Sequence, residues 1–481
     1  MITAVSWIPK GALKSVPNVA EPPSKEEIKE LIESGAFARS VDGSHEDEEE
    51  VEEDGNQISE VDHAKAVAEA FGKSSKSKTS TSMEVDEVAE GLKELDMDNY
   101  DEEDDGIELF SSGLGDLYYP SNEMDPYLKD VAPTDSVIIC ARNEDEISHL
   151  EIYVYEEANG SPNMYVHHHI IIPEFPLCTA WMDCPLKGGE KGNFVAIGSK
   201  DTPTIEIWDL DVRDEVLPCV QLGGKEETKM SKKKMSKKEK TKKQKYKEGS
   251  HTDSVLGLAW NKEFRNILAS ASADKTVKVW DVATGTCKIT MEHHTKEVQA
   301  VAWNHYSPEV ILSGSFDQTV VLKDVRKPSH SGFKWSVMSD VESLAWDPHS
   351  EHSFVVSLED GTVKGFDIRT AESGSDAELK PSFTLQAHDQ DKGVSSISYN
   401  ISAPNLLATG SMDKTVKLWD LTNNEPSCIA IHKPKAGAVF SISFSADNPF
   451  LLAIGGSKGE LHVWDTLLDA TVARRFGSSQ S

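Results

Sequence analysis

An aromatic residue ends a short apolar segment at nearly regular intervals along the second half of this 481-residue chain. Successive aromatic residues lie 43, 43, 53 and 45 positions apart. They are Trp260, Trp303, Trp346, Tyr399 and Phe444. A period of about 40 to 50 residues is typical of β-propeller blades, which are small sheets of four strands. The chain is therefore expected to repeat one small sheet many times.

Each repeat contains three apolar segments, and residues 250–281 are its clearest copy. In this copy the first segment ends at Trp260, and the third ends at Trp280, 20 positions later. The same separation of 20 recurs four times: Trp303 to Lys323, Trp346 to Phe366, Tyr399 to Trp419 and Phe444 to Trp464. Because this separation stays at 20 while the distance from one repeat to the next varies, the segments are predicted strands of one unit.

These repeats resemble the WD repeat, because His251 and the pair Trp280 and Asp281 stand where that family has its Gly-His and Trp-Asp signatures. The resemblance covers most of residues 120–477 and implies a β-propeller. Two earlier repeats have inner aromatic residues at Trp7 and Trp181, and third segments ending at Tyr155 and Trp208. Both counts reach seven, so we predict an all-β, seven-bladed WD-repeat β-propeller.

The domain organisation follows from these matches. Residues 1–9 are the predicted inner strand of blade one, and residues 10–115 form an acidic, largely disordered insertion with short helices. The propeller occupies 116–477, interrupted by a lysine-rich loop at 225–249, and 478–481 form a disordered tail. The other strands of blade one are expected at Val137–Ala141, Leu150–Tyr155 and Met164–Ile171, and an outer strand of the last blade is expected at Thr471–Phe476.

Two oppositely charged segments interrupt the repeats. Residues 41–110 contain 25 acidic residues against 5 lysines, a local charge of −20 in a chain whose net charge is −33. Such a segment cannot bury enough apolar surface to remain ordered alone, and it suits basic protein partners. Within it, Ser44 precedes His-Glu-Asp-Glu and is a candidate site for an acidophilic kinase. The strand assignment places the acidic segment and the lysine-rich loop on opposite faces of the propeller.

Residues 225–247 contain 12 lysines and only 3 acidic residues. This lysine block allows three interpretations: a solubilising loop, a nuclear or nucleolar import signal, and a contact with RNA or DNA phosphates that releases counterions. Tyr246 is its one aromatic residue, so reading of bases is not expected. The lysines concerned are Lys232, Lys233, Lys234, Lys237, Lys238, Lys240, Lys242, Lys243, Lys245 and Lys247.

The WD resemblance implies that two sets of four residues form hydrogen-bonded chains within their blades. The sets are His251, Ser270, Asp274 and Trp280, and His388, Thr409, Asp413 and Trp419. Histidine beside serine and aspartate also suggests a hydrolase, but recurrence in several blades favours a packing device. A partial set, His294, Ser313 and Asp317, has Lys323 in the tryptophan position.

Other chemistries find little support in the sequence. The six cysteines lie far apart and are expected to be buried and reduced. Among His167, His168 and His169, only the first and third would share a face of a strand, so no metal site is predicted. No cofactor motif occurs, and no segment reaches membrane-spanning length.

Several features resemble one family more closely, the periodic tryptophan protein 1 family. They are the early strand at Trp7, the motifs 99–103 and 125–127, the segment 165–168, and the lysine block after Trp208, Asp209 and Leu210. The resemblance implies a non-enzymatic protein of the nucleus and nucleolus, acting in ribosomal RNA synthesis or processing. Its partners would be proteins of pre-ribosomal or chromatin complexes, with a monomer outside them. A chromatin-associated module and a ubiquitin-ligase substrate adaptor are the alternatives.

Overall fold

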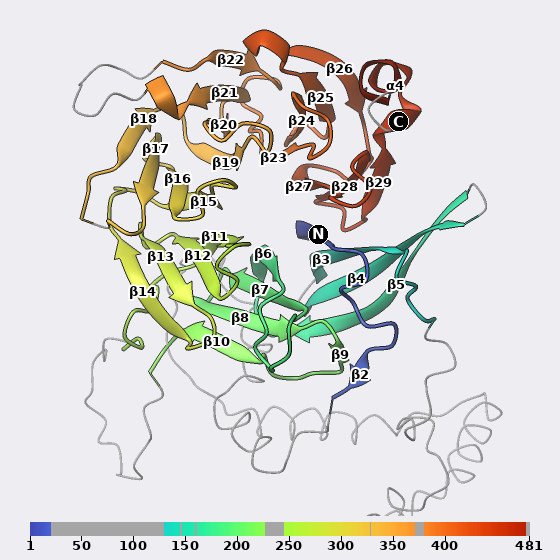
Figure 1. Cartoon of the computed structure of the whole chain (residues 1–481), viewed down its shortest axis with the longest axis vertical. Coiled ribbons are helices and arrows are strands. Elements are labelled where there is room, and N and C mark those ends of the chain that lie inside the picture. The colour runs from blue at the N-terminus through green and yellow to red at the C-terminus, as the bar shows by residue number, and fades with distance from the viewer. Residues whose placement is uncertain are drawn as a thin grey trace, which may run out of the picture. The chain divides into compact units, whose positions relative to one another are not determined.

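The computed structural model describes residues 1–20, 129–144, 147–158, 161–226, 245–327, 329–370 and 380–477. Ser44, most of the predicted insertion, lysines 232–243 and the tail 478–481 lie outside these ranges. The described residues form seven blades around a central channel (Figure 1), so the predicted propeller is confirmed. No helix among them is long and apolar enough to cross a membrane.

Six blades are antiparallel sheets of four strands, each ordered from the channel outward. Blade one contains β1 (Ile2–Ile8), β3 (Ser136–Glu144), β4 (Ile147–Ala158) and β5 (Ser161–Ile172); blade two contains β6 (Pro176–Met182), β7 (Phe194–Ser199), β8 (Thr204–Asp209) and β10 (Val220–Gly223); blade three contains β11 (Val255–Trp260), β12 (Ile267–Ser272), β13 (Val277–Asp281) and β14 (Thr286–Met291).

The remaining elements follow the same order. Blade four contains β15 (Val298–Trp303), β16 (Val310–Ser315), β17 (Thr319–Asp324) and β18 (Phe333–Ser336); blade five contains β19 (Val341–Trp346), β20 (Ser353–Leu358), β21 (Thr362–Asp367) and β22 (Phe383–Gln386); blade six contains β23 (Ser396–Tyr399), β24 (Leu406–Gly410), β25 (Val416–Asp420) and β26 (Ser427–His432); blade seven contains β27 (Val439–Phe444), β28 (Leu451–Gly456) and β29 (His462–Asp465). Short 3-10 helices follow three of the third strands: η4 (Ile368–Thr370), η5 (Thr422–Asn424) and η6 (Thr466–Leu468).

Blade one is assembled from two distant parts of the chain, as predicted. Strand β1 pairs with β3, whose residues follow more than 120 positions later. On its other side β1 contacts blade seven: the indole Nε1 of Trp7 donates to the carbonyl of Ser443 over 2.8 Å, and the amide of Val5 donates to Ser441 Oγ over 3.1 Å. The first strand therefore closes the ring.

The equivalent of the WD tryptophan in blade one is Tyr153, and the expected position, Tyr155, is wrong. Trp7 pairs with Ile138, which pairs with Tyr153, whereas Tyr155 pairs with Ser136. The error has a simple cause. Strand β4 has 12 residues, and residues two apart point to the same face of a strand.

The predicted outer strand at Thr471–Phe476 is also wrong, because these residues form the helix α4 (Ala470–Phe476). Asp469 caps the helix, since its Oδ1 accepts hydrogen bonds from the amides of Thr471 and Val472. Val472 and Phe476, four residues apart, pack into the core between blades six and seven. Blade seven consequently has three strands.

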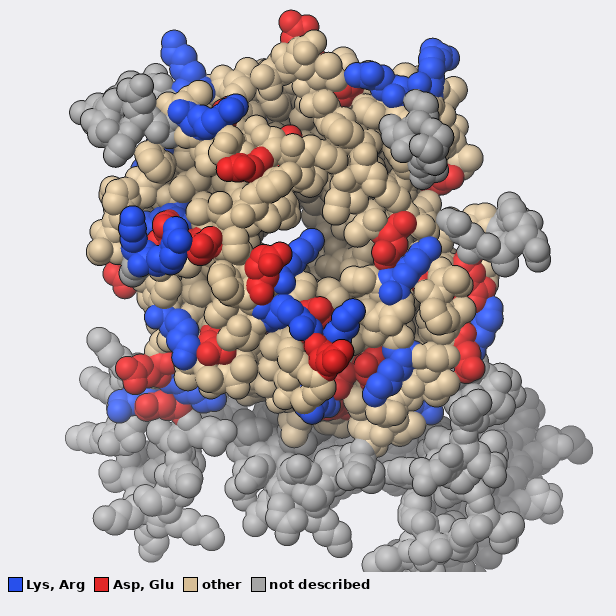
Figure 2. Space-filling view, viewed as in Figure 1, with Lys and Arg blue, Asp and Glu red and all other residues tan. Residues whose placement is uncertain are grey.

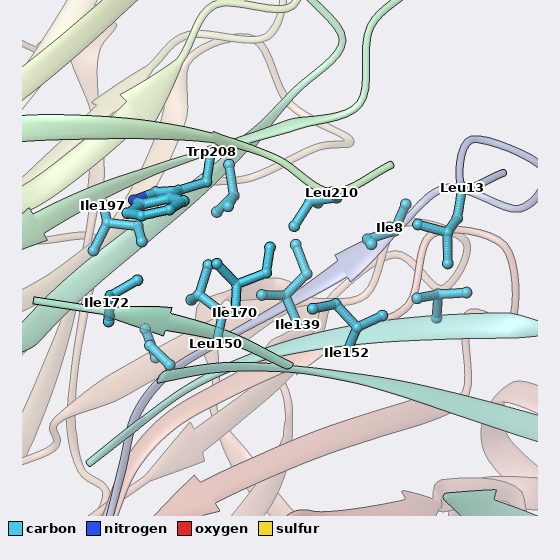
Figure 3. Close-up of a cluster of buried hydrophobic side chains, with 14 of the residues drawn as sticks. Ile8, Leu13, Ile139, Leu150, Ile152, Ile170, Ile172, Ile197, Trp208 and Leu210 are labelled. Atoms are coloured by element: carbon cyan, nitrogen blue, oxygen red, sulfur yellow. The ribbon is translucent and has the colours of Figure 1, made fainter. Parts of the chain in front are cut away.

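Residues 10–20, assigned to the insertion from sequence, lie against blades one and two. Leu13 is buried in the cluster that joins these blades through Ile8, Ile139 and Trp208 (Figure 3). Farther on, β2 (Asn18–Val19) pairs in parallel with β9 (Val212–Arg213), which connects the third and fourth strands of blade two. The start of the insertion, residues 10–20, is therefore anchored to the propeller.

The strands that precede the two charged segments end on opposite faces of the ring, in agreement with the strand assignment. The acidic segment follows the end of an inner strand, β1, whereas the lysine block follows the end of an outer strand, β10. In an antiparallel sheet of four strands, the first and fourth strands run in opposite directions. Their ends therefore lie on opposite faces of the ring.

Candidate functional site

The histidine set of blade three forms a continuous hydrogen-bonded chain. His251 Nδ1 lies 2.8 Å from Asp274 Oδ2, and its Nε2 lies 2.6 Å from Ser270 Oγ. The indole of Trp280 donates to the same Ser270 oxygen over 2.8 Å. These hydrogen bonds link the connection before β11 to strands β12 and β13 and to the turn between them. They therefore hold three parts of blade three together.

The charge state of this chain follows from burial. Burial lowers the pKa of His251 below its ordinary value, although the hydrogen bond to Asp274 opposes the shift. Burial alone would raise the pKa of Asp274, but hydrogen bonds from His251 and Thr276 outweigh it and leave that pKa low. A neutral imidazole beside a carboxylate donates from Nδ1, so its Nε2 accepts the proton of the Ser270 hydroxyl.

The same geometry argues against nucleophilic chemistry at this chain. His251 and Ser270 are completely buried, and Trp280 is 1% exposed. The Ser270 oxygen already accepts from an indole, and no substrate carbonyl could reach it without displacing that ring. These residues act as a structural device.

Blade six contains a second complete chain. His388 Nδ1 lies 2.8 Å from Asp413 Oδ2, and its Nε2 lies 2.7 Å from Thr409 Oγ1. The indole of Trp419 donates to that hydroxyl over 3.0 Å. Threonine thus fills the role of serine without a change in connectivity.

Other blades change either the donor or the acceptor of this hydrogen bond. In blade four, His294 contacts Ser313 and Asp317, and a second imidazole, Nε2 of His293, lies 2.8 Å from the same Ser313 oxygen. In blade two, Trp208 donates to a carboxylate, Glu206, instead of a hydroxyl. Burial raises the pKa of Glu206 to about 7. Sequence reasoning missed His293 and Glu206, because neither belongs to the WD pattern.

The three consecutive histidines are arranged differently from the expectation. A β-bulge interrupts the pairing of β4 with β5, so His167 and His168 are both buried and His169 is exposed. The Nδ1 atoms of His167 and His168 are 2.7 Å apart. Burial, followed by the charge of His167, lowers the pKa of His168 to about 3. The pairing of His167 with His169 is therefore wrong.

Among the residues that the structure describes, no three potential metal ligands come together. All six cysteines are free, but the expectation that they are buried holds only for Cys140 and Cys184. Cys178, Cys219 and Cys287 are partly buried, and Cys428 is exposed.

The periodic aromatic residues meet at the mouth of the central channel. A cavity of about 610 Å³ is lined by the ends of the inner strands of blades three to seven, including Trp260, Trp303, Trp346, Tyr399 and Phe444. On the face that Figure 2 shows, the centre of the ring is hollowed and basic and acidic side chains are intermixed around it. The residues that define the repeat in sequence thus share one site in space.

Large apolar side chains are exposed beside this cavity. Phe264, Tyr306 and Ile401 are 48%, 52% and 45% exposed. Each belongs to the connection between the first and second strands of its blade, and Ile401 also lines the cavity. Connections between the first and second strands all leave the same face of the ring, so the three exposed side chains lie on one face. We call these three side chains the apolar rim.

Hydrogen bonds between neighbouring blades hold the cavity wall. Three indoles donate to the backbone carbonyl of the preceding blade: Trp7 to Ser443, Trp303 to Ala259 and Trp346 to Ala302. Three asparagines, each directly after an inner aromatic residue, donate to a carbonyl of the following blade: Asn261 to Pro308, Asn304 to Glu351 and Asn400 to Pro449. Sequence reasoning missed these asparagines, although the repeated dipeptide of an aromatic residue and asparagine would have revealed them.

The base of the lysine block is ordered by backbone pairing. Lys225 and Tyr246 form an antiparallel bridge, and the amide of Glu226 donates to the carbonyl of Lys245 over 2.9 Å. Of the ten lysines singled out, Lys245 and Lys247 lie in the described residues, and the others lie outside them. The loop is therefore held at its base beside the first residues of blade three.

Comparison with known proteins shows the family. A family model described as the WD domain, G-beta repeat, matches residues 242–281, 285–324, 379–420 and 426–465. Periodic tryptophan protein 1 of Saccharomyces cerevisiae is 32% identical over 99% of this chain and 90% of its own length. The chain belongs to the periodic tryptophan protein 1 family. A WD repeat-containing protein of Schizosaccharomyces pombe is 38% identical over 82% of this chain and 77% of its own.

A more limited similarity involves a third protein. A Culex quinquefasciatus protein named as a ribosome biogenesis protein homologue is 30% identical over 22% of this chain and 23% of its own. For this member of the periodic tryptophan protein 1 family, the four matched repeats contain the first three strands of blades three, four, six and seven. Three of the four matches begin before the inner strand, at or near the outer strand of the preceding blade, so the sequence repeat is offset from the blade.

Replacing Trp280 with alanine should lower the free energy of unfolding by about 3 to 5 kcal/mol, because it leaves a cavity in a fully buried site. Trp464→Ala is the matched control, since Trp464 holds the same position in blade seven and is only partly buried. Urea unfolding followed by fluorescence measures both. Equal losses in the two variants would contradict the importance of burial.

The buried histidines should make stability depend on pH. The folded-state pKa values of His251 and His388 lie below their ordinary values, so the unfolded chain binds protons first as the pH falls. Their contribution is complete above about pH 6.5 and decreases below it, by up to about 2 kcal/mol per histidine at pH 5.

The test compares unfolding midpoints at pH 5 and pH 7 in the wild type and in the double variant His251→Gln and His388→Gln. The variant should be less stable at pH 7 and show a smaller difference between the two pH values. His169→Gln, at an exposed position, should keep the wild-type difference.

Proposed function

We propose that this protein is a non-catalytic scaffold of ribosome biogenesis in the nucleus and nucleolus, which holds protein partners on its propeller. The observation that carries the proposal is similarity to Periodic tryptophan protein 1 over 99% of the chain. The relative named for ribosome biogenesis supports the assignment. The partners would be proteins of pre-ribosomal particles, and the chain would be monomeric outside them.

The geometry supports a scaffold through two features. The histidine chains that could suggest catalysis are buried and saturated with hydrogen bonds. The apolar rim, in contrast, is open to solvent beside a cavity of about 610 Å³. Aromatic side chains in such a position are the residues that contribute most to protein interfaces. We assign protein binding to this face.

The lysine block would add electrostatic contact with ribosomal RNA and direct import into the nucleus. Its base follows the outer strand β10, whereas the described chain before the acidic segment follows the inner strand β1, so basic and acidic ligands would be held on different sides. Neutralising phosphates with lysines releases counterions, so this contact should weaken as the salt concentration rises. Ser44 stays a predicted phosphorylation site that would make the acidic segment more negative.

The first test is purification of the tagged full-length protein from cells, with and without ribonuclease, beside a variant lacking residues 225–247. Ribosomal precursors and assembly proteins should copurify with the wild type. The deletion should reduce both RNA recovery and nucleolar localisation, because it removes 12 lysines. Recovery of ubiquitin-ligase subunits without ribosomal precursors would favour the adaptor and reject the proposal.

The second test concerns the apolar rim. Tyr306→Asp should reduce recovery of protein partners about tenfold or more, because it places a charge in the middle of an apolar contact. Met338→Asp is the matched control: Met338 is 74% exposed but lies in a connection between blades, on the opposite face. If the Met338 variant loses the partners and the Tyr306 variant keeps them, the assignment of the face is wrong.

A further inference from the structure

Among the residues that the structure describes, blade seven lacks the outer strand that the other six blades possess. In those blades a fourth strand pairs antiparallel with the third. After β29, the chain instead enters η6 and the capped helix α4, whose apolar residues are committed to the core between blades six and seven. The segment that would return as a fourth strand is therefore used elsewhere.

The missing strand leaves the third strand of this blade partly exposed. All four residues of β29 are only partly buried, whereas the first four residues of β13 are buried. Trp464 shows the effect most directly, because its equivalents Trp208 and Trp280 are at most 1% exposed. One face of the Trp464 ring stacks on His432 at a centroid distance of 4.6 Å.

The backbone of β29 is also available. Strand β29 pairs with β28 along one side, and no other backbone hydrogen bond involves His462–Asp465 among the residues that the structure describes. Alternate N–H and C=O groups of an edge strand point away from its sheet. Such an edge selects an extended peptide, because only an extended backbone matches the spacing of these groups.

We propose that the open edge of blade seven binds an extended segment of a partner protein, which adds to β29 as an antiparallel fourth strand. This inference rests on the proposed scaffold function and specifies the chemistry of one partner. The other blades show what the segment must contain. Their outer strands place apolar side chains at alternate positions, including Ile289 and Met291 in blade three, Trp335 in blade four, Leu385 in blade five and Ala430 in blade six.

Charged residues near His462 indicate which residues the C-terminal end of the bound segment should carry. In blade three the last residue of the outer strand, Met291, pairs with the first residue of the third strand, Val277. The C-terminal end of a bound segment would likewise approach His462 and the turn before it. That turn carries the exposed Lys458, whose amide donates to the carbonyl of Ala436 over 3.0 Å.

Two further lysines belong to the same loop region. Lys433 and Lys435 are exposed on the connection that contains Ala436, and none of the three lysines has an ion pair among the described residues. The nearest carboxylate in sequence, Glu460, faces His462 at 3.7 Å. The bound segment should therefore carry acidic residues directly after its alternating apolar residues.

The test uses a synthetic peptide with the sequence of residues 284–293, in which Cys287 is replaced by serine. It contains an outer strand of this propeller followed by Glu292. Hydrogen exchange is measured by mass spectrometry on the full-length protein, with and without millimolar peptide. Exchange of the amides of 462–465 should slow at least about fivefold when the peptide binds. A scrambled peptide without alternating apolar residues should give no protection.

A charge variant sharpens the result. Lys458→Glu should weaken peptide binding about threefold or more, because it places a carboxylate beside Glu292 of the peptide. Lys414→Glu is the matched control, since Lys414 is exposed in the corresponding turn of blade six, whose edge is occupied by β26. Its affinity should equal that of the wild type.

Two results would overturn the inference. One is unchanged exchange of 462–465 at millimolar peptide. The other is slow exchange, in the free protein, of the amides of 462–465 that point away from β28, since another segment of the same chain would then cover the edge. Both exchange measurements use purified protein. The peptide can therefore fail to bind while ribosomal precursors still copurify with the protein, and the peptide can bind even if no precursors copurify.

Discussion

No blade of this propeller can bury both faces of its own sheet, so each depends on its neighbours. The inner strands are almost continuously apolar for that reason, and the core clusters extend across blade boundaries. The indoles of Trp303 and Trp346 reach backward to the preceding blade, while Asn261 and Asn304 reach forward to the next. The apolar packing and the hydrogen bonds between blades therefore both fix how each blade is oriented relative to its neighbour.

The proposed binding site contains some of the residues that join the blades. The aromatic rings that join the blades also line the cavity, so the wall of the proposed protein site is part of the framework. A wall built this way is rigid, and little ordering entropy is lost when a partner binds to it. The exposed rim residues would determine which partner is accepted, and Tyr306 also joins two blades, because its hydroxyl donates to the carbonyl of Pro348 over 2.9 Å.

The spacing of residues predicted the fold well, because residues at a constant separation in sequence take equivalent positions in the strand pairing of every blade. The constant interval from Trp260 to Trp280 reappears as a ladder in which both residues pair with Leu268. Prediction failed where a local choice overrode the pattern. Asp469 capped a helix in the segment expected to be a strand, and a bulge in β5 cancelled the alternation of the histidines. Whether a segment forms a helix or a strand, and whether a strand contains a bulge, depends on the neighbouring elements, which the sequence alone does not specify.

Placing the first strand between the first and last blades also affects how the chain can be made. Strand β1 leaves the ribosome before any other element, yet its neighbours in blade seven, β27 and β28, are synthesised more than 430 residues later. At about 5 to 20 residues per second, the apolar β1 waits for tens of seconds without that partner. During synthesis the propeller is an open arc, and an intact ring exists only after blade seven has emerged.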